Sequence, residues 1–155
     1  MKKLLFLALL SAGIAHADIL PNAKVTPGKP DPKNTSVVIC AKGFTTTTIR
    51  NVPESEKKQV YANYGIVNHG GYCNGPSGCE VDHLISLELG GSNDVTNLWP
   101  QPYDGQWNAH MKDKLENKLH TLMCSGTISQ ADAQKAISTN WIDAYIKYVD
   151  PTAKK

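Results

Sequence analysis

The sequence predicts a small α+β domain, and three patterns carry this prediction. Residues 81–87 form an apolar, β-prone run, and a second short β-prone run lies at residues 96–99. Gly90 and Gly91 stand between them in a stretch of turn-forming residues, which predicts a chain reversal between two antiparallel strands. From about Gln106, apolar residues recur every three or four positions, which predicts a helix with one buried stripe.

Three polar side chains are expected to meet where the first predicted strand ends. Asp82 and His83 are sequence neighbours, so in a strand they project to opposite faces and reach one site only at a strand end or a bulge. The glycine-rich turn supplies such a point, and it would place Asn97 beside them. The helix would lie behind this site, with a buried stripe of Trp107, Met111, Leu115, Leu119 and Leu122 and a polar face of His110, Asp113, Asn117 and His120.

The rest of the chain is expected to complete a single domain at residues 35–150. Four prolines in residues 18–34 predict an irregular or extended lead-in. Residues 35–40 and 44–49 are β-prone and are separated by a short break, which predicts an N-terminal β-hairpin. Residues 66–78 are expected to form a loop.

Cap and stop signals place further helices on either side of the central pattern. A helix at residues 53–64 would begin with a proline and end before Gly65, a residue type that commonly follows helix ends. Ser129 begins a capping-box pattern that opens a short helix to about residue 137. Asn140 is expected to cap a last helix, which the proline at position 151 ends.

Residues 1–17 have the layout of a secretory signal. Lys2 and Lys3 precede a short apolar run, and an Ala-x-Ala cleavage pattern ends at Ala17. The run is too short for a membrane anchor, so we expect cleavage and export to the periplasm or beyond it.

The charge of the chain is balanced once this leader is set aside. The chain has 16 basic and 14 acidic residues, and two of the basic ones lie in the leader. Bulk charge therefore gives no support for nucleic-acid binding. A local basic surface stays open, built from Lys24, Lys29, Lys33 and Lys42, or from Lys112, Lys114 and Lys118, for which a solvated helix face is an equally good interpretation.

All four cysteines lie beyond the leader, and an exported chain meets an oxidising compartment, so two disulfides are expected. Cys73 and Cys79 enclose a short flexible loop that could close on itself, which would leave Cys40 to pair with Cys124. The sequence alone permits all three pairings. A metal site made of these cysteines is disfavoured, because a Cys-x5-Cys spacing without a second close pair is poor zinc geometry.

The order of these motifs resembles that of the HNH endonucleases of the His-Me finger superfamily. Residues 82–101 have the form D-H-L-I-x-L-E-L-G-G-x-x-D-x-x-N-L-W-P-Q, and residues 112–117 have the form K-D-x-L-E-N. These patterns are most similar to those of secreted bacterial members, and residues 38–45 also look like an N-terminal portion of such proteins. An ordered match over residues 80–124 is more specific than a lone Asp-His pair.

The resemblance implies a ββα-metal module at residues 80–124. Hydrolysis of a phosphodiester needs an activated water, and an imidazole titrating near neutral pH is a suitable general base, so we assign this role to His83. Asp82 is the candidate ligand of a divalent cation, which stabilises the charge of the transition state. By the resemblance, Asn97 either completes the metal shell or holds the loop of His83, and His110 is a further ligand or a phosphate contact.

The sequence thus predicts an exported, monomeric endonuclease that acts on DNA, with RNA open as a second substrate, without stable membrane association. The expected cofactor is Mg²⁺, with Mn²⁺ or another divalent ion as alternatives. Many HNH proteins carry two Cys-x-x-Cys pairs around a structural zinc; this chain has none, so disulfides and core packing would take that part. Two alternatives stay open: a nucleic-acid-binding module without catalysis, and a disulfide-stapled secreted interaction protein in which Asp82 and His83 are incidental.

Overall fold

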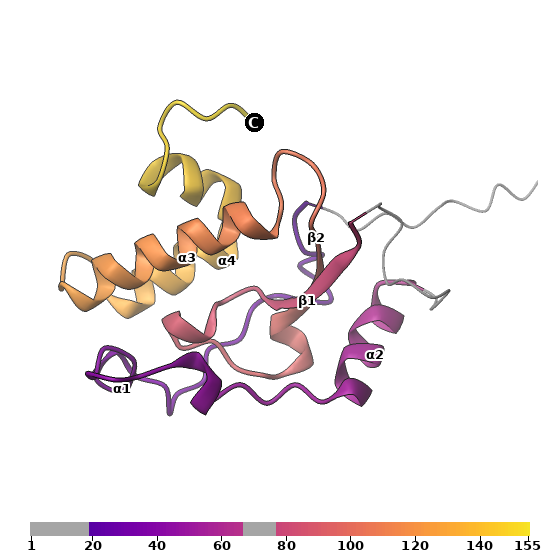
Figure 1. Ribbon diagram of the computed structural model, residues 1–155, viewed down its shortest axis with the longest axis horizontal. Helices are drawn as coiled ribbons and strands as arrows, with labels where there is room; N and C mark the ends of the chain where they lie inside the picture. The colour runs from indigo at the N-terminus through magenta and orange to yellow at the C-terminus, as the bar shows by residue number, and fades with distance from the viewer. Residues whose placement is uncertain (1–18, 67–76) are drawn as a thin grey trace, which may run out of the picture.

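A two-stranded antiparallel sheet lies between the helices of an α+β fold (Figure 1). The computed structural model describes residues 19–66 and 77–155. Strand β1 (Cys79–His83) pairs with β2 (Leu98–Pro102), and His83 stands opposite Leu98. The first strand ends earlier than its β-prone run predicts, because the chain turns after His83 into the 3-10 helix η2 (Leu87–Leu89). A second 3-10 turn, η3 (Val95–Asn97), leads into β2.

Gly90 and Gly91 make the turn between the strands possible, for two different reasons. Gly90 ends η2 in the left-handed region, with φ of 85°. Gly91 is needed for space, because a Cβ there would lie 1.7 Å from the carbonyl oxygen of Ile85. The reversal that the glycines predict is confirmed.

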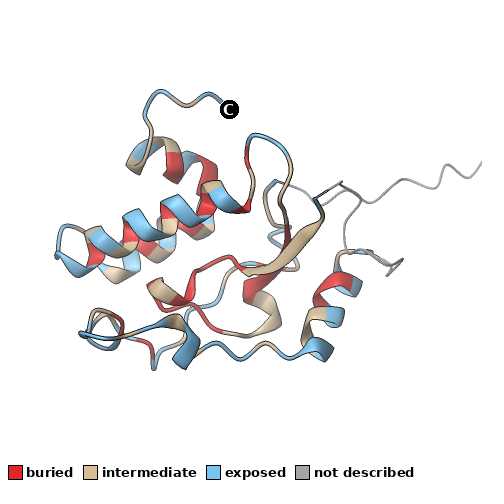
Figure 2. Ribbon diagram, viewed as in Figure 1, coloured by how far each residue is buried: buried red, intermediate tan, exposed pale blue. Residues whose placement is uncertain are grey.

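Helices α3 (Ala109–Cys124) and α4 (Gln130–Tyr148) lie side by side and form most of the core (Figure 1). Their facing sides carry the buried residues (Figure 2). Leu115 and Leu119 of the predicted stripe are fully buried, whereas Met123 rather than Leu122 completes it at the C-terminal end. Trp107 precedes the helix and packs edge-on against two aromatic residues of α4, so its predicted place in the core is confirmed.

Helix α4 combines the two helices that the cap signals predict. Its backbone is non-helical at Asn140, whose side-chain Oδ1 accepts hydrogen bonds from the backbone N–H groups of Ile142 and Asp143. The side chain of Ser129 accepts from the N–H of Asp132 at the first turn. Both predicted caps are therefore present, and the second helix begins directly where the first one ends.

The predicted N-terminal β-hairpin is wrong. Its first half contains the short helix α1 (Ser36–Ile39), and its second half contains the 3-10 turn η1 (Thr46–Thr48). Ile39 points into the core, and the N–H of Ser36 donates to the side chain of Gln130 in α4. Contacts with the two long helices thus outweigh the β preference of these residues, which depends on context.

Helix α2 (Glu54–Asn63) agrees with the prediction to within a residue or two. Pro53 stands immediately before it, and Gly65 follows it with a φ of 68°. Figure 1 places α2 on the other side of the sheet from α3 and α4. Of the loop expected at residues 66–78, positions 67–76 lie outside the described residues, as do residues 1–18, which include the predicted leader at residues 1–17.

The lead-in is irregular, as predicted, but it is tied closely to the domain. Thr26 Oγ1 donates to the carbonyl of Leu98, 2.8 Å away. The indole N–H of Trp141 in α4 donates to the carbonyl of Ile19 over the same distance. The first described residue is thus bonded to one of the last helical turns.

A disulfide joins Cys40 to Cys124, with their Cα atoms 5.4 Å apart. Of the two bridges expected from the sequence, this is the one with the larger sequence separation, and it ties the end of α1 to the end of α3. Cys79 is also disulfide-bonded, and Cys73 lies outside the described residues. Within residues 19–66 and 77–155, no helix is long and apolar enough to cross a membrane.

Candidate active site

Asp82 and His83 lie at the end of β1 and have different neighbours. Asp82 Oδ2 accepts a hydrogen bond from the Lys112 ammonium of α3 at 2.6 Å. The His83 ring instead meets Asn93, in the turn before β2, with 3.1 Å between Nε2 and Oδ1. This follows from the alternation of side chains along a strand. Asp82 and His83 are therefore adjacent in the sequence, but their side chains make two separate sets of contacts.

The hydrogen bonds of Asn93 fix the tautomer of His83. Asn93 Nδ2 donates to the carbonyl of Ile49 at 2.8 Å, and Oδ1 accepts from the N–H of Asn51 at 3.1 Å. The amide oxygen must then face His83, so Nε2 of the imidazole carries the hydrogen. In a neutral ring the lone pair is consequently on Nδ1.

That Nδ1 atom is buried and has no hydrogen-bond partner within the described part of the chain. The whole residue is only 1% exposed. Burial lowers the pKa of His83, an effect that nearby Asp82 opposes and that the positive charge of Arg50 reinforces. His83 is therefore held neutral, with a free basic nitrogen.

Lys112 lies at the centre of a buried charge cluster. Its side chain has no exposed surface, and its ammonium donates to Asp82 Oδ2, to the carbonyl of His83 at 2.7 Å and to the Glu116 carboxylate. Burial alone would lower the pKa of Lys112, but the two carboxylates together outweigh it and raise that pKa. For the acid Glu116 burial has the opposite effect and raises the pKa, although the charge of Lys112 opposes this rise. The cluster fixes Asp82 and the end of β1 against α3.

Further carboxylates surround the outer side of Asp82. Burial raises the pKa of Glu80 and of Asp113, and repulsion from Asp82 adds to the rise in both. Glu80 also accepts a hydrogen bond from the Tyr103 hydroxyl at 2.9 Å. Three carboxyl groups are thus close enough to repel one another, with Lys112 as the neighbouring buried cation.

Asn97 is fully buried and uses its whole amide for backbone hydrogen bonds. Oδ1 accepts from the N–H groups of Lys29 and Ile85, and Nδ2 donates to the carbonyls of Ile85 and Ser92, at 2.8 to 3.1 Å. An amide has capacity for four such bonds, and all four are made. Of the two roles predicted for Asn97, this arrangement favours holding the loop that follows His83.

His110 stands at the solvent-facing start of α3, with a side chain that is 71% exposed. Its Nδ1 lies 3.9 Å from a carboxylate oxygen of Asp113, and its ring lies 5.6 Å from that of Tyr103. His110 therefore contacts Asp113 and Tyr103, on the side of the site where the carboxylates lie. His120, about one turn before the end of the helix, lies instead beside the Cys40–Cys124 disulfide.

A pocket of about 410 Å³ lies beside β1. Its lining combines Arg50 and Lys57 with residues of β1, among them Val81, which shares a strand face with His83. Arg50 is the residue whose charge acts on His83. Glu54 and Glu80 also line the pocket, and a carboxylate oxygen of Glu54 lies 3.6 Å from the Lys57 ammonium, so the two cations of the lining are balanced by two carboxylates.

Sequence reasoning missed three residues of this region. Lys112 was placed with the basic surface candidates, yet it lies on the buried stripe, three residues before Leu115, and that spacing was a readable signal. Arg50 and Asn93 are not adjacent to His83 in the sequence, and no local sequence pattern predicts that they interact with it.

Comparisons with protein-family models, with curated proteins and with solved structures find no match for this chain. The site therefore has to be interpreted from its own geometry.

Proposed function

We propose that this protein is an exported, metal-dependent endonuclease with a ββα-metal centre, which hydrolyses phosphodiester bonds of DNA and accepts RNA as a second substrate. The observation that carries the proposal is the neutral His83, whose Nε2–H is held by Asn93 and whose Nδ1 has no hydrogen-bond partner among the described residues. His83 stands at the end of β1, and α3 follows β2 in the chain, an order of elements that resembles the HNH pattern.

His83 Nδ1 would take the proton of the attacking water. The resulting imidazolium would keep its Nε2–H bond to Asn93 and would be stabilised by the neighbouring Asp82, whose charge favours the protonated ring. Arg50, in the pocket beside β1, would supply positive charge for the phosphate backbone. Contacts of this kind carry no base information, which supports low sequence preference.

Asp82 is the candidate ligand for a hard divalent cation, and two further carboxylates lie near it, although within the described residues the three do not form a closed group of ligand atoms. Asp82, Glu80 and Asp113 offer carboxylate oxygens, and their mutual repulsion is what a cation such as Mg²⁺ would relieve. When bound, the cation would stabilise the charge that develops on the leaving oxygen. Lys112 has a different duty: it neutralises the inner oxygen of Asp82 and fixes its direction.

Export is supported by the pattern of residues 1–17 and by the Cys40–Cys124 disulfide, which suits an oxidising compartment. The mature chain would begin at Asp18, two residues before Leu20. Mass spectrometry of the exported protein tests this directly, because a retained Met1 would contradict cleavage.

Nicking of a supercoiled plasmid tests the activity. We expect nicking with Mg²⁺ or Mn²⁺ and none with a chelator. His83→Ala should lower turnover by roughly 10²- to 10⁴-fold while the variant keeps its fold. Asp82→Ala should be partly rescued by excess metal, a rescue that His83→Ala lacks. Lys135→Ala, an exposed change on α4, serves as the matched control.

One observation favours a second function. His83 is almost completely buried, so a water molecule reaches it only if the surrounding loop opens. A nucleic-acid-binding module without catalysis is therefore the second candidate. It would retain DNA at low salt with or without chelator and leave the plasmid intact, whereas the interaction-protein alternative predicts no DNA binding.

A further inference from the structure

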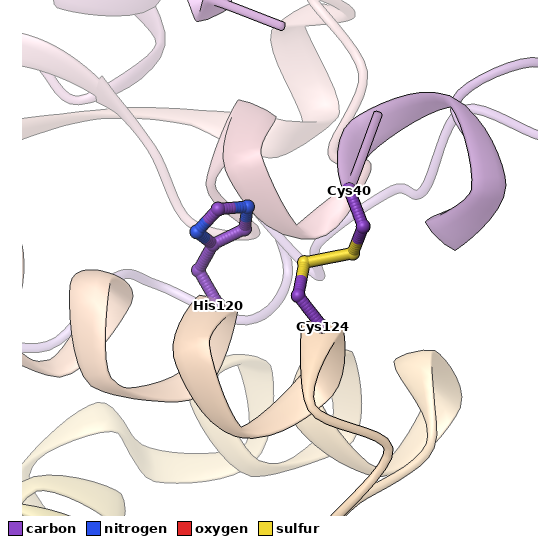
Figure 3. A group of neighbouring side chains, drawn as sticks. All are labelled: Cys40, His120 and Cys124. Carbon is purple, nitrogen blue, oxygen red and sulfur yellow. A yellow bond between two sulfur atoms is a disulfide. The ribbon is translucent and has the colours of Figure 1, made fainter. Parts of the chain in front are cut away.

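Three metal-ligating side chains meet near the C-terminal end of α3, further along the helix than Lys112 and Glu116. The sulfur atoms of Cys40 and Cys124 and a ring nitrogen of His120 all lie within 4.8 Å of one another. Figure 3 shows His120 and Cys124 projecting from the same side of α3 while Cys40 approaches from α1. His120 and Cys124 are four residues apart, which places them on one face of the helix.

His120 is not fully satisfied in this arrangement. Its Nε2 atom is buried and lacks a hydrogen-bond partner in the described ranges, 19–66 and 77–155. A buried polar nitrogen without a partner costs free energy, so a ligand at this position would be stabilising. Burial raises the pKa of Glu88, and His120 is close enough to oppose that rise, so a carboxyl group also lies near the cluster.

We propose that reduction of the Cys40–Cys124 disulfide converts this cluster into a binding site for Zn²⁺, held by both cysteine sulfurs and by His120. Two thiolates and an imidazole are the ligands that zinc prefers, and they are poor ligands for Mg²⁺. Water would fill the fourth position of the tetrahedron. This site is separate from the oxygen-rich site of the proposed hydrolysis and does not depend on that proposal.

The conversion balances as a two-electron step. A thiol reductant supplies two electrons and two protons, the S–S bond breaks, and the reductant leaves as its own disulfide. Zinc then displaces the two thiol protons to solvent and binds two thiolates and a neutral imidazole.

The geometry requires little movement. With Zn–S bonds of about 2.3 Å and tetrahedral angles, the two sulfurs would stand about 3.8 Å apart, so after reduction they must move apart from their bonded distance through rotation of the two cysteine side chains. The Cα atoms of Cys40 and Cys124 are already 5.4 Å apart. The metal would therefore tie α1 to α3 in the reduced protein, as the disulfide does in the oxidised one.

Cobalt binding tests the proposal, because Co²⁺ substitutes for zinc and its bonds to thiolates absorb in the near ultraviolet. The mature protein, oxidised or reduced with a phosphine and desalted under nitrogen, is titrated with Co²⁺ and then with Zn²⁺. We expect one Co²⁺ per reduced chain, displaced by Zn²⁺, and no thiolate band in the oxidised chain. His120→Ala should weaken binding by more than the roughly 10- to 100-fold typical of losing an outer-shell partner.

Three variants separate this site from its alternatives. His110→Ala removes an exposed histidine of the same helix and should leave binding unchanged. Cys73→Ser/Cys79→Ser should keep the band, and Cys40→Ser/Cys124→Ser should lose it. Equal Co²⁺ affinity in His120→Ala and wild type, or a band that depends only on Cys73 and Cys79, would overturn the proposal. If the reduced chain unfolds, Zn²⁺ must restore its circular dichroism spectrum; failure to do so would also overturn it.

Discussion

Replacing Asn97 by aspartate separates the two roles that this residue could have. A metal ligand should tolerate the change, because a carboxylate binds divalent cations better than an amide does. A residue that fixes the loop should not. Asp keeps the acceptor for the N–H groups of Lys29 and Ile85, but it turns both donors into an oxygen that faces the carbonyls of Ile85 and Ser92.

The magnitude follows from the four hydrogen bonds and the complete burial of Asn97. Two buried carbonyl groups lose their donors at about 1–3 kcal/mol each, and a charge or an added proton is buried with them. We expect Asn97→Asp to lower the free energy of unfolding by at least about 3 kcal/mol. Domains of this kind have only about 5–15 kcal/mol in total, so the effect is large.

Urea unfolding followed by circular dichroism measures this difference, with and without Mg²⁺. Asn63→Asp is the matched control, because Asn63 is exposed and its side-chain oxygen accepts from the side chain of Gln59, a partner that aspartate can keep. That control should stay within about 0.5 kcal/mol of wild type. If Asn97→Asp is as stable as the control and gains stability from Mg²⁺, the loop-holding role is refuted and the ligand role stands.

Three further changes test the packing, the turn and one ion pair. Leu115→Ala should lower the free energy of unfolding by about 2 to 5 kcal/mol through a cavity beside α4, whereas Lys118→Ala should change it little; equal melting temperatures would mean that the helical register is wrong. Gly91→Ala should cost about 3 kcal/mol or more, measured in the same assay, since its Cβ would meet the carbonyl of Ile85; a wild-type value would show that the turn is looser than described. The hydrogen bonds and the ion pair of Asp94 lower its pKa from 3.8 to about 2. Asp94 therefore stabilises the fold fully above pH 3.8, and this stabilisation is lost as the pH falls through 2. The melting temperature of Asp94→Asn should lie below that of wild type by an amount that shrinks across this pH range, and a constant difference would contradict the assignment.

The elements that the sequence predicts well are those with local signals. The stripe around Leu115, the caps at Ser129 and Asn140, and the end of α2 each follow from residues within a few positions of one another. The Cys40–Cys124 bridge was one of three open pairings, because cysteine spacing alone does not decide connectivity.

The elements that the sequence predicts poorly depend on distant partners. Residues 35–49 are β-prone, yet Ile39 is buried against helices whose position the local sequence does not contain. A buried lysine is stable only with paired charges, and the partners of Lys112 include Asp82, thirty residues earlier. The tautomer of His83 depends on Asn93, whose own orientation is set by Ile49.

The bond between Trp141 and Ile19 has a consequence for the order in which the protein folds. It joins residues 122 positions apart, so the start of the domain cannot reach its final place until nearly the whole chain has been synthesised. Contacts of such long range slow folding, because the chain loses much conformational freedom before it gains them. If the chain is exported as proposed, its N-terminal segment would cross the membrane before α4 does. The chain would then stay unfolded until translocation is almost complete.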